Sequence, residues 1–121
     1  MVPLYNTGEG LSVLLESFSA LHLEVPWELI LVDDGSSDGT AERVTTALKK
    51  LPINAKLIQL ARNYGEHAAV MEGYRQSRGE IVVNLDDDLQ TPLSEALCLV
   101  AKLKQGSAEI VYADYRQKKA H

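Results

Sequence analysis

The sequence contains a single cysteine, Cys98, so it cannot form an internal disulfide. A chain without disulfides fits a reducing compartment, and we therefore expect a cytoplasmic protein. No apolar run approaches the roughly 18 residues that a membrane-spanning helix needs, and no signal peptide is recognisable. These residues are therefore not expected to cross a membrane.

Basic residues are also scarce, because 12 Lys and Arg stand against 17 Asp and Glu and give a net charge of −5. A nucleic-acid binder usually carries a basic surplus, so nucleic acid is not expected among the partners. Arg116, Lys118 and Lys119 crowd the C-terminal end, which is more typical of a solvated tail than of a binding patch. The content of 45% hydrophobic and 24% charged residues is ordinary for a soluble globular domain.

Apolar runs alternate with helical periodicities along the chain. The expected order of elements, β-α-β-α-β-α-β-α-β, predicts an α/β fold with a doubly wound, mostly parallel sheet and helices on both faces. The chain begins with what reads as the last few residues of a strand, so we expect a truncated sheet and a fragment of a longer protein. The expected strands are 2–6, 27–32, 55–60, 80–85 and 109–113, and the expected helices follow residues 7–10, 39, 65 and 92.

Polar residues gather where the predicted strands end. In parallel sheets covered by helices, ligands bind outside the carboxyl ends of the strands. Four separate loops would bring polar groups to one such rim, and this predicts a binding site there. These groups are Tyr5-Asn6, Asp33-Asp34, Arg62-Asn63 and the residues from Asp86 to Gln90.

The acidic run at 86–88 predicts a cation site. Adjacent carboxylates repel by about 1 kcal/mol in water and about 4 kcal/mol at an effective dielectric of 20. Strand alternation sends Asp86 and Asp88 to one side, with Gln90 following and Asp87 pointing elsewhere. Two carboxylates and an amide oxygen suit Mg²⁺ or Mn²⁺, which complete their shell with water and substrate phosphates, so a diphosphate ligand is expected. A solvent-exposed acidic loop is the alternative.

Three other positions have a structural or a functional interpretation. Asp38 or a nearby serine is expected to cap the helix that follows. Asp34, a second carboxylate at the same strand end, is suited to a nucleoside base or ribose. Arg62 is suited to a phosphate, with a surface ion pair as the alternative.

Taken together, four motifs resemble those of the family-2 glycosyltransferases, in the family's order and spacing and over essentially the whole chain. The resemblance is strongest to the branch that acts on polyprenyl phosphates, which includes dolichol-phosphate and bacterial undecaprenyl-phosphate sugar transferases. The motifs are Val2-Pro3-Leu4-Tyr5-Asn6, Val32 to Thr40, Arg62-Asn63-Tyr64-Gly65 and Asp86-Asp87-Asp88-Leu89-Gln90.

The resemblance implies a GT-A fold and inverting transfer of a sugar from a nucleoside diphosphate. Residues 1–121 would form a single nucleotide-sugar-binding domain of a longer enzyme that works at the cytoplasmic face of a membrane. By resemblance, Pro3, Tyr5 and Asp34 would contact the nucleoside, and Arg62 would lie in the donor pocket. Asp86 would contact the ribose or the metal. Asp88 and Gln90 would hold the metal.

One position departs from the family's pattern, and one further segment extends the resemblance. Thr7 stands where the family commonly has Glu after the Tyr-Asn pair, which puts a donor contact by that side chain in doubt. Tyr112 to Arg116 resembles the family's strand that ends in a basic residue after the donor half.

The acceptor decides whether a general base is needed. A polyprenyl phosphate is already an anion near neutral pH, so positioning and metal-assisted departure of the nucleotide are sufficient. A hydroxyl acceptor such as a polysaccharide needs a base, and these residues offer no convincing candidate. The catalytic residues therefore stay unassigned.

Other function classes remain as alternatives. A non-catalytic nucleotide-sugar and metal-binding fragment fits the short chain. A signalling receiver does not fit, because Ala61-Arg62-Asn63 follows the third predicted strand in place of a phosphoacceptor aspartate. A dinucleotide-binding oxidoreductase would need a glycine fingerprint that is absent. An exposed edge of a truncated sheet also raises the hypothesis of a homo-oligomer.

Overall fold

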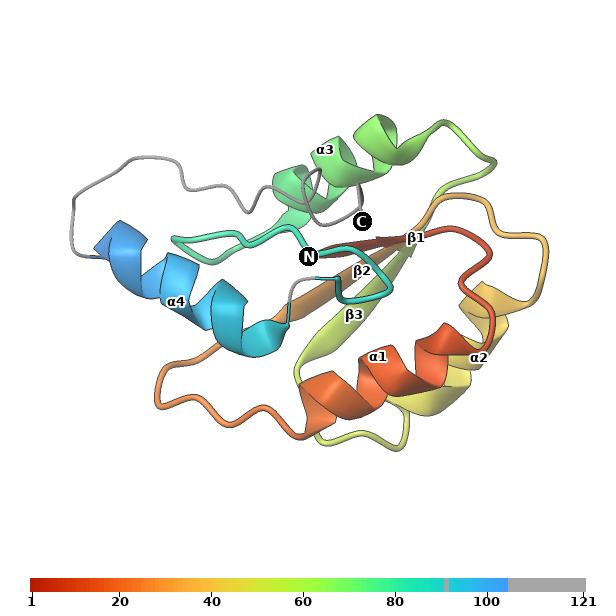
Figure 1. The fold of residues 1–121 in the computed structure, drawn as a ribbon. Helices are drawn as coiled ribbons and strands as arrows, with labels where there is room; N and C mark the ends of the chain where they lie inside the picture. The colour runs from red at the N-terminus through yellow and green to blue at the C-terminus, as the bar shows by residue number, and fades with distance from the viewer. Residues whose placement is uncertain (91, 105–121) are drawn as a thin grey trace, which may run out of the picture. The chain divides into compact units, whose positions relative to one another are not determined.

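The computed structural model describes residues 1–90 and 92–104, and the chain divides into two compact units, Met1–Asp88 and Leu89–His121. The first unit contains a sheet covered by helices (Figure 1), and in the second the structure describes helix α4 (Leu93–Lys104). The single domain expected over 1–121 stays a prediction. Among the described residues, no helix has both the length and the apolar character needed to cross a membrane.

The sheet of the first unit is parallel. Its strands β1 (Val2–Leu4), β2 (Leu29–Asp33) and β3 (Ala55–Gln59) lie in the order β1-β2-β3. Leu4 lies opposite Asp33, and Asp33 lies opposite Gln59, so the three carboxyl ends are level. All five residues of the central strand β2 are buried, as expected for a continuous apolar run covered on both faces.

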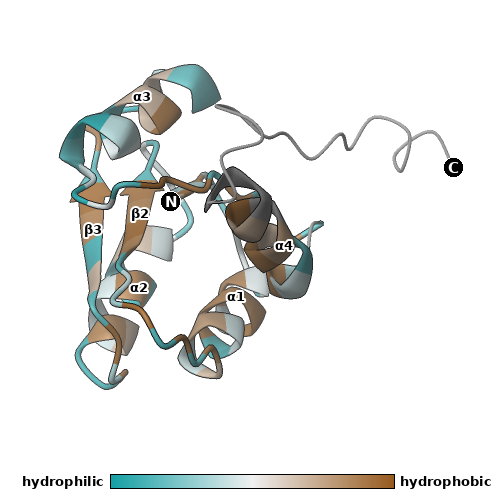
Figure 2. Ribbon diagram, turned by 90° about the vertical axis from the view of Figure 1, so that its left-hand side faces the viewer, coloured by the Kyte–Doolittle hydropathy of each residue, from teal (hydrophilic) through white to brown (hydrophobic). Residues whose placement is uncertain are grey.

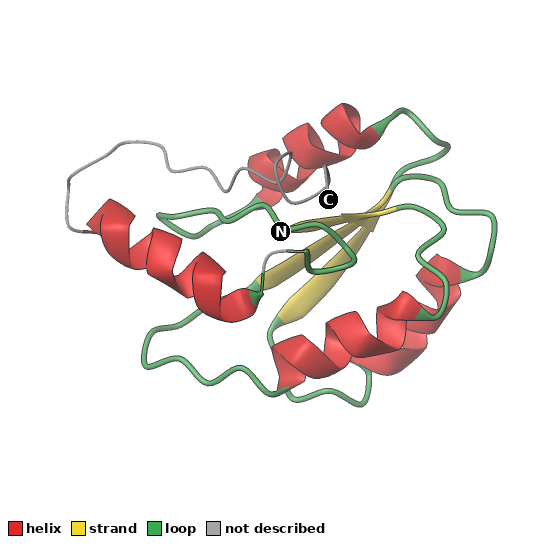
Figure 3. Ribbon diagram, in the orientation of Figure 1, coloured by secondary structure: helices red, strands yellow, loops and turns green. Residues whose placement is uncertain are grey.

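Helices cover both faces of this sheet. Helices α1 (Gly10–Ser19) and α2 (Thr40–Leu48) lie on one face and α3 (Glu66–Gln76) lies on the other, as Figures 1 and 3 show. Figure 2 shows the apolar residues of β2 between these two helical layers. The predicted α/β fold with a parallel sheet is confirmed.

The helices are amphipathic and turn apolar side chains towards the core. Helix α1 buries Leu11, Leu14, Leu15 and Phe18. The small residues of α3 allow close packing, because a Cβ added to Gly73 would lie 2.5 Å from Cγ of Met1. The core on this face consists of Met1, Ile30, Val32 and Ala69, with Ile58, Leu60 and Val70 packed against it.

The strand predicted at 80–85 is wrong as a regular strand. The segment joins the edge of β1 through Met1, whose amine donates to the Val83 carbonyl at 2.7 Å and whose carbonyl accepts from the Leu85 N–H at 3.0 Å. The next rung of a parallel ladder would need an N–H from Pro3, which proline lacks. The ladder therefore does not extend along β1. The strand expected at 109–113 and the Tyr112–Arg116 segment lie outside the described residues.

Candidate functional site

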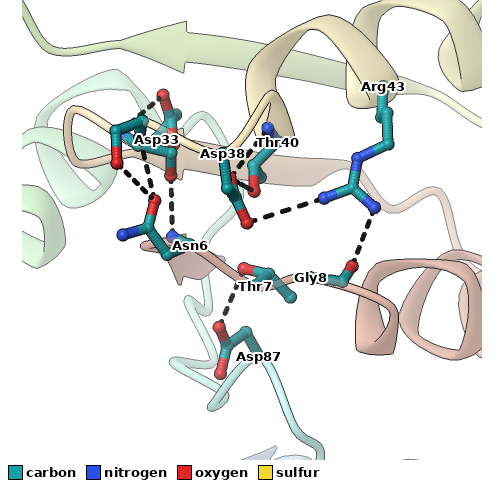
Figure 4. Close-up of polar contacts among 10 residues, drawn as sticks. Asn6, Thr7, Gly8, Asp33, Asp38, Thr40, Arg43 and Asp87 are labelled. Atoms are coloured by element: carbon teal, nitrogen blue, oxygen red, sulfur yellow. Dashed lines mark hydrogen bonds and ion pairs between the residues drawn. The ribbon is translucent and has the colours of Figure 1, made fainter.

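The loop after β1 is tied to the loop after β2. Asn6 has a left-handed backbone with φ of 46°, a conformation that asparagine tolerates better than most residues. Its N–H donates to Ser36 Oγ at 2.9 Å, and its Oδ1 accepts from the Ser37 N–H at 2.8 Å (Figure 4). Asn6 thus fixes the course of both loops at the carboxyl edge of the sheet.

Asp33 organises the turn that follows β2. It is buried, and its carboxylate accepts hydrogen bonds from the hydroxyl and from the N–H of Ser36. This is the local turn-forming role of aspartate, in which the side chain bonds to backbone a few residues ahead. Because Ser36 Oγ also accepts from Asn6, the turn and the loop after β1 form one network (Figure 4).

Asp34 connects the end of β1 with the loops after β2 and β3. The residue is 3% exposed, and Oδ1 and Oδ2 accept from the N–H groups of Tyr64 at 2.8 Å and Gly65 at 3.0 Å. Its own N–H donates to the Leu4 carbonyl at 2.8 Å. Each carboxylate oxygen has a second acceptor site, so a contact with a nucleoside base stays a prediction. The structural role was missed, because bonds between residues thirty positions apart leave no local pattern in the sequence.

Gly35 brings the loop after β3 directly onto the loop after β2. Its φ is 73°, and an added Cβ would lie 2.3 Å from the Arg62 carbonyl carbon and 2.4 Å from the Asn63 nitrogen. No side chain fits between backbones at those distances. The motif glycine is therefore required for this approach, and it places Arg62 at the same edge as Asp34.

Of the remaining predicted donor residues, Tyr5 and Arg62 are exposed in the loops at this edge, and Pro3 lies in β1. Tyr5 and Tyr64 are 48% and 52% exposed, and Pro3 is half-buried in β1. The guanidinium carbon of Arg62 lies 5.1 Å from the centre of the Tyr64 ring, a cation–π contact. The aromatic contact orients Arg62, and its contact with a phosphate stays a prediction.

The acidic run forms a turn, with Asp87 and Asp88 at its centre and Leu89 at a φ of 48°. The expectation that strand alternation turns Asp86 and Asp88 to one side is therefore wrong in its premise, because alternation requires extended backbone. Asp87 lies against the loop after β1, where it accepts a hydrogen bond from Thr7 Oγ1 at 2.9 Å (Figure 4). This fourth loop thus joins the same rim.

The residues of this turn suit a hard divalent cation by their chemistry. Asp88 is exposed and Asp86 is half-buried, and both offer carboxylate oxygens of the kind that Mg²⁺ and Mn²⁺ prefer. Within residues 1–90 and 92–104, no group of three or more His, Cys, Asp and Glu side chains is placed to hold a metal. A cation here would thus take much of its shell from water and phosphate. Gln90, the third predicted ligand, belongs to the second unit and is exposed.

Asp38 and Arg43 anchor the start of α2 and were only partly anticipated. Gly39 occupies the N-cap position with φ of 86°, so the predicted cap at Asp38 is displaced by one residue. Asp38 still accepts from the N–H and hydroxyl of Thr40, and the hydroxyl bond holds the pKa of Asp38 below its ordinary value. Arg43 lies 3.7 Å from Asp38 and donates to the Gly8 carbonyl at 3.0 Å (Figure 4).

Comparison with known proteins gives consistent results. The sequence model of glycosyl transferase family 2 matches residues 1–121. Undecaprenyl-phosphate 4-deoxy-4-formamido-L-arabinose transferases from Pectobacterium carotovorum and Salmonella paratyphi A are 44% and 41% identical over 108 residues. These matches cover 88% of the chain and 33% of each relative, so the chain spans about a third of the length of these curated relatives.

Solved structures share the fold. Crystal structures of S. aureus TarS 1–349 with UDP and with UDP-GlcNAc superpose with TM-scores of 0.67 and 0.62, each at 29% identity. The matches cover 84% of this chain and 31% and 30% of the TarS chains.

Proposed function

Because the chain belongs to glycosyl transferase family 2, we propose that it is the donor-binding part of an enzyme that transfers a sugar from a nucleoside diphosphate to a polyprenyl phosphate. The observation that carries this proposal is the 44% identity, over 88% of the chain, to proteins named undecaprenyl-phosphate sugar transferases. A polyprenyl phosphate is a membrane lipid, so the complete enzyme would meet it at a membrane surface. We also propose that this surface is the cytoplasmic face of the membrane.

The rim at the carboxyl edge of the sheet supports the donor half of the proposal. The loops after the three strands and the turn at 86–88 are joined by the hydrogen bonds of Asn6, Asp34 and Thr7. A rigid edge of this kind holds a ligand at little cost in loop ordering. We assign the nucleoside to Pro3, Tyr5 and Asp34, and the phosphates to the neighbourhood of Arg62.

The acidic turn would hold the cation. Asp86 and Asp88 would contribute protein ligands, and Mg²⁺ or Mn²⁺ would neutralise charge on the departing diphosphate. Inversion follows if the acceptor phosphate attacks the anomeric carbon directly in a single displacement. That oxygen is already anionic, so the residues of this chain need to orient the donor and need not remove a proton.

Removing one carboxylate tests the metal assignment. Asp88→Ala is expected to weaken Mn²⁺-dependent UDP binding by about tenfold or more, since one lost charged contact is worth about 1.5–3 kcal/mol. Isothermal titration of UDP with and without Mn²⁺ measures the effect. Glu16→Ala, which removes an exposed carboxylate on α1, is the control and should bind as the unaltered chain does. Equal affinities for Asp88→Ala and Glu16→Ala would contradict the metal assignment.

A second candidate, nucleotide-sugar binding without turnover, is favoured by one observation: the chain spans a third of its curated relatives. Incubation with a UDP-sugar and undecaprenyl phosphate, followed by analysis of the extracted lipid, distinguishes the two. A glycosylated lipid product supports transfer by these residues alone. Binding without product assigns turnover to a longer chain.

A further inference from the structure

The hydrogen bond from Thr7 Oγ1 to Asp87 Oδ2 joins two segments that lie 80 positions apart in the sequence. It is 2.9 Å long and partly buried, and its acceptor is a carboxylate. Hydrogen bonds to ionised acceptors are stronger than those between neutral groups. The contact therefore fixes the acidic turn against the loop after β1.

The donor side of this contact is held firmly. Asn6, the residue before Thr7, bonds to Ser36 and Ser37, and Gly8, the residue after it, accepts from Arg43 at 3.0 Å (Figure 4). Thr7 thus projects from a loop that is anchored on both sides of it. A hydroxyl in this position can restrain whatever bonds to it.

The acceptor side is a turn in which the restraint matters. Asp87 lies between Asp86 and Asp88, so fixing its side chain limits the positions of both neighbours. The backbone at 87–88 is a turn, and regular strand pairing does not define it. The Thr7 contact supplies a restraint that a strand ladder would otherwise provide.

We infer that Asp87 is a positioning residue that, through its hydrogen bond with Thr7, holds Asp86 and Asp88 in the arrangement that receives the divalent cation. The inference rests on the proposed function, because it presumes a cation at the acidic turn. Asp87 itself acts through the turn and not as a ligand. Its pairing with Thr7 gives a role to the threonine that stands where the family commonly has glutamate.

Mn²⁺ affinity in the presence of UDP tests the inference directly. Free Mn²⁺ is titrated by electron paramagnetic resonance with saturating UDP, and UDP affinity without metal is measured in parallel. Thr7→Val is expected to weaken Mn²⁺ binding about three- to tenfold, which corresponds to about 0.7–1.4 kcal/mol of binding free energy. UDP affinity without metal should stay unchanged, whereas a general loss of structure would lower it.

Matched variants separate the hydroxyl from the substitution. Thr7→Ser keeps a hydroxyl and should bind Mn²⁺ nearly as the unaltered chain does. Thr45→Val removes a hydroxyl that donates to the Ala41 carbonyl within α2, and it should leave Mn²⁺ affinity unchanged. In an Asp87→Ala background, Thr7→Val should have no further effect, because the double-mutant cycle isolates the pair.

The outcomes are distinguishable. Mn²⁺ binding by the unaltered chain with no loss in Thr7→Val would overturn the positioning role alone. An equal loss from Thr7→Val with and without Asp87 would overturn it as well. Failure of the unaltered chain to bind Mn²⁺ with UDP would overturn the metal part of the proposed function, and the inference with it.

Discussion

Gly35 and Gly8 share a left-handed backbone but differ in their surroundings. Their φ values are 73° and 68°, so alanine at either position strains the backbone. An added Cβ meets the backbone of Arg62 and Asn63 at Gly35, whereas it has nothing within 4 Å at Gly8. The two glycines therefore separate the cost of conformation from the cost of a steric clash.

Gly35→Ala is expected to lower the free energy of unfolding by about 2–4 kcal/mol, the sum of backbone strain and overpacking. Gly8→Ala should lower it by about 1–2 kcal/mol, from strain alone. Urea unfolding followed by circular dichroism measures both. A loss at Gly35 no larger than that at Gly8 would show that the loop after β3 moves aside easily.

Among the elements, the segment at 80–85 shows how one backbone atom limits a strand. Its apolar residues are typical of a buried strand, yet its pairing with β1 involves Met1 alone among the contacts described above. Successive residues of a strand direct their N–H groups to opposite edges. Leu4 bonds to β2, so the nitrogen of Pro3 faces the 80–85 segment without a hydrogen to donate.

Pro3→Ala is expected to extend this ladder by one rung. The new N–H at position 3 should exchange with solvent slowly, because the Leu85 carbonyl lies at the next acceptor position of the ladder. Stability should change by less than about 1 kcal/mol, since one hydrogen bond offsets the lost rigidity of proline. Amide hydrogen exchange by NMR checks this. Exchange at position 3 as fast as in an unfolded chain would contradict the proposed register.

At the scale of the whole molecule, the N-terminal amine links folding to pH. Met1 is buried, and burial lowers the pKa of its amine from 8.0 to about 6, with Glu28 opposing the shift. Between these two values, the unfolded chain binds more protons than the folded chain. The free energy of unfolding is therefore highest, as far as this amine is concerned, above pH 8. It falls as the pH drops from 8 towards 6.

For the chain with a free amine at Met1, unfolding free energy should rise by roughly 2–3 kcal/mol between pH 5.5 and 8.5, at about 1.4 kcal/mol for each unit of pKa shift. Urea unfolding at several pH values measures this contribution. The N-terminally acetylated chain is the control, because it has no amine to titrate. The same rise in the acetylated chain would assign the pH dependence to other groups.

The sequence by itself determined most of the helices and strands and the polar rim, but not the failure of residues 80–85 to form a regular strand. The sequence predicted a helix after Gly65, which the structure shows as α3 (Glu66–Gln76), and the polar ends of the strands marked the loops that the structure brings together. These features are local, because the period of buried residues and the turn-forming residues are both read within a few positions. The four motifs also identified the family.

Only the tertiary structure decided which groups meet across the rim. The contacts of Asp34 with Tyr64 and Gly65, and of Thr7 with Asp87, depend on strand register and on the paths of loops far apart in sequence. The missing N–H of Pro3 matters only because β1 turns that nitrogen towards residues 80–85. Local patterns carry no information on such pairings, since they arise from where whole elements pack.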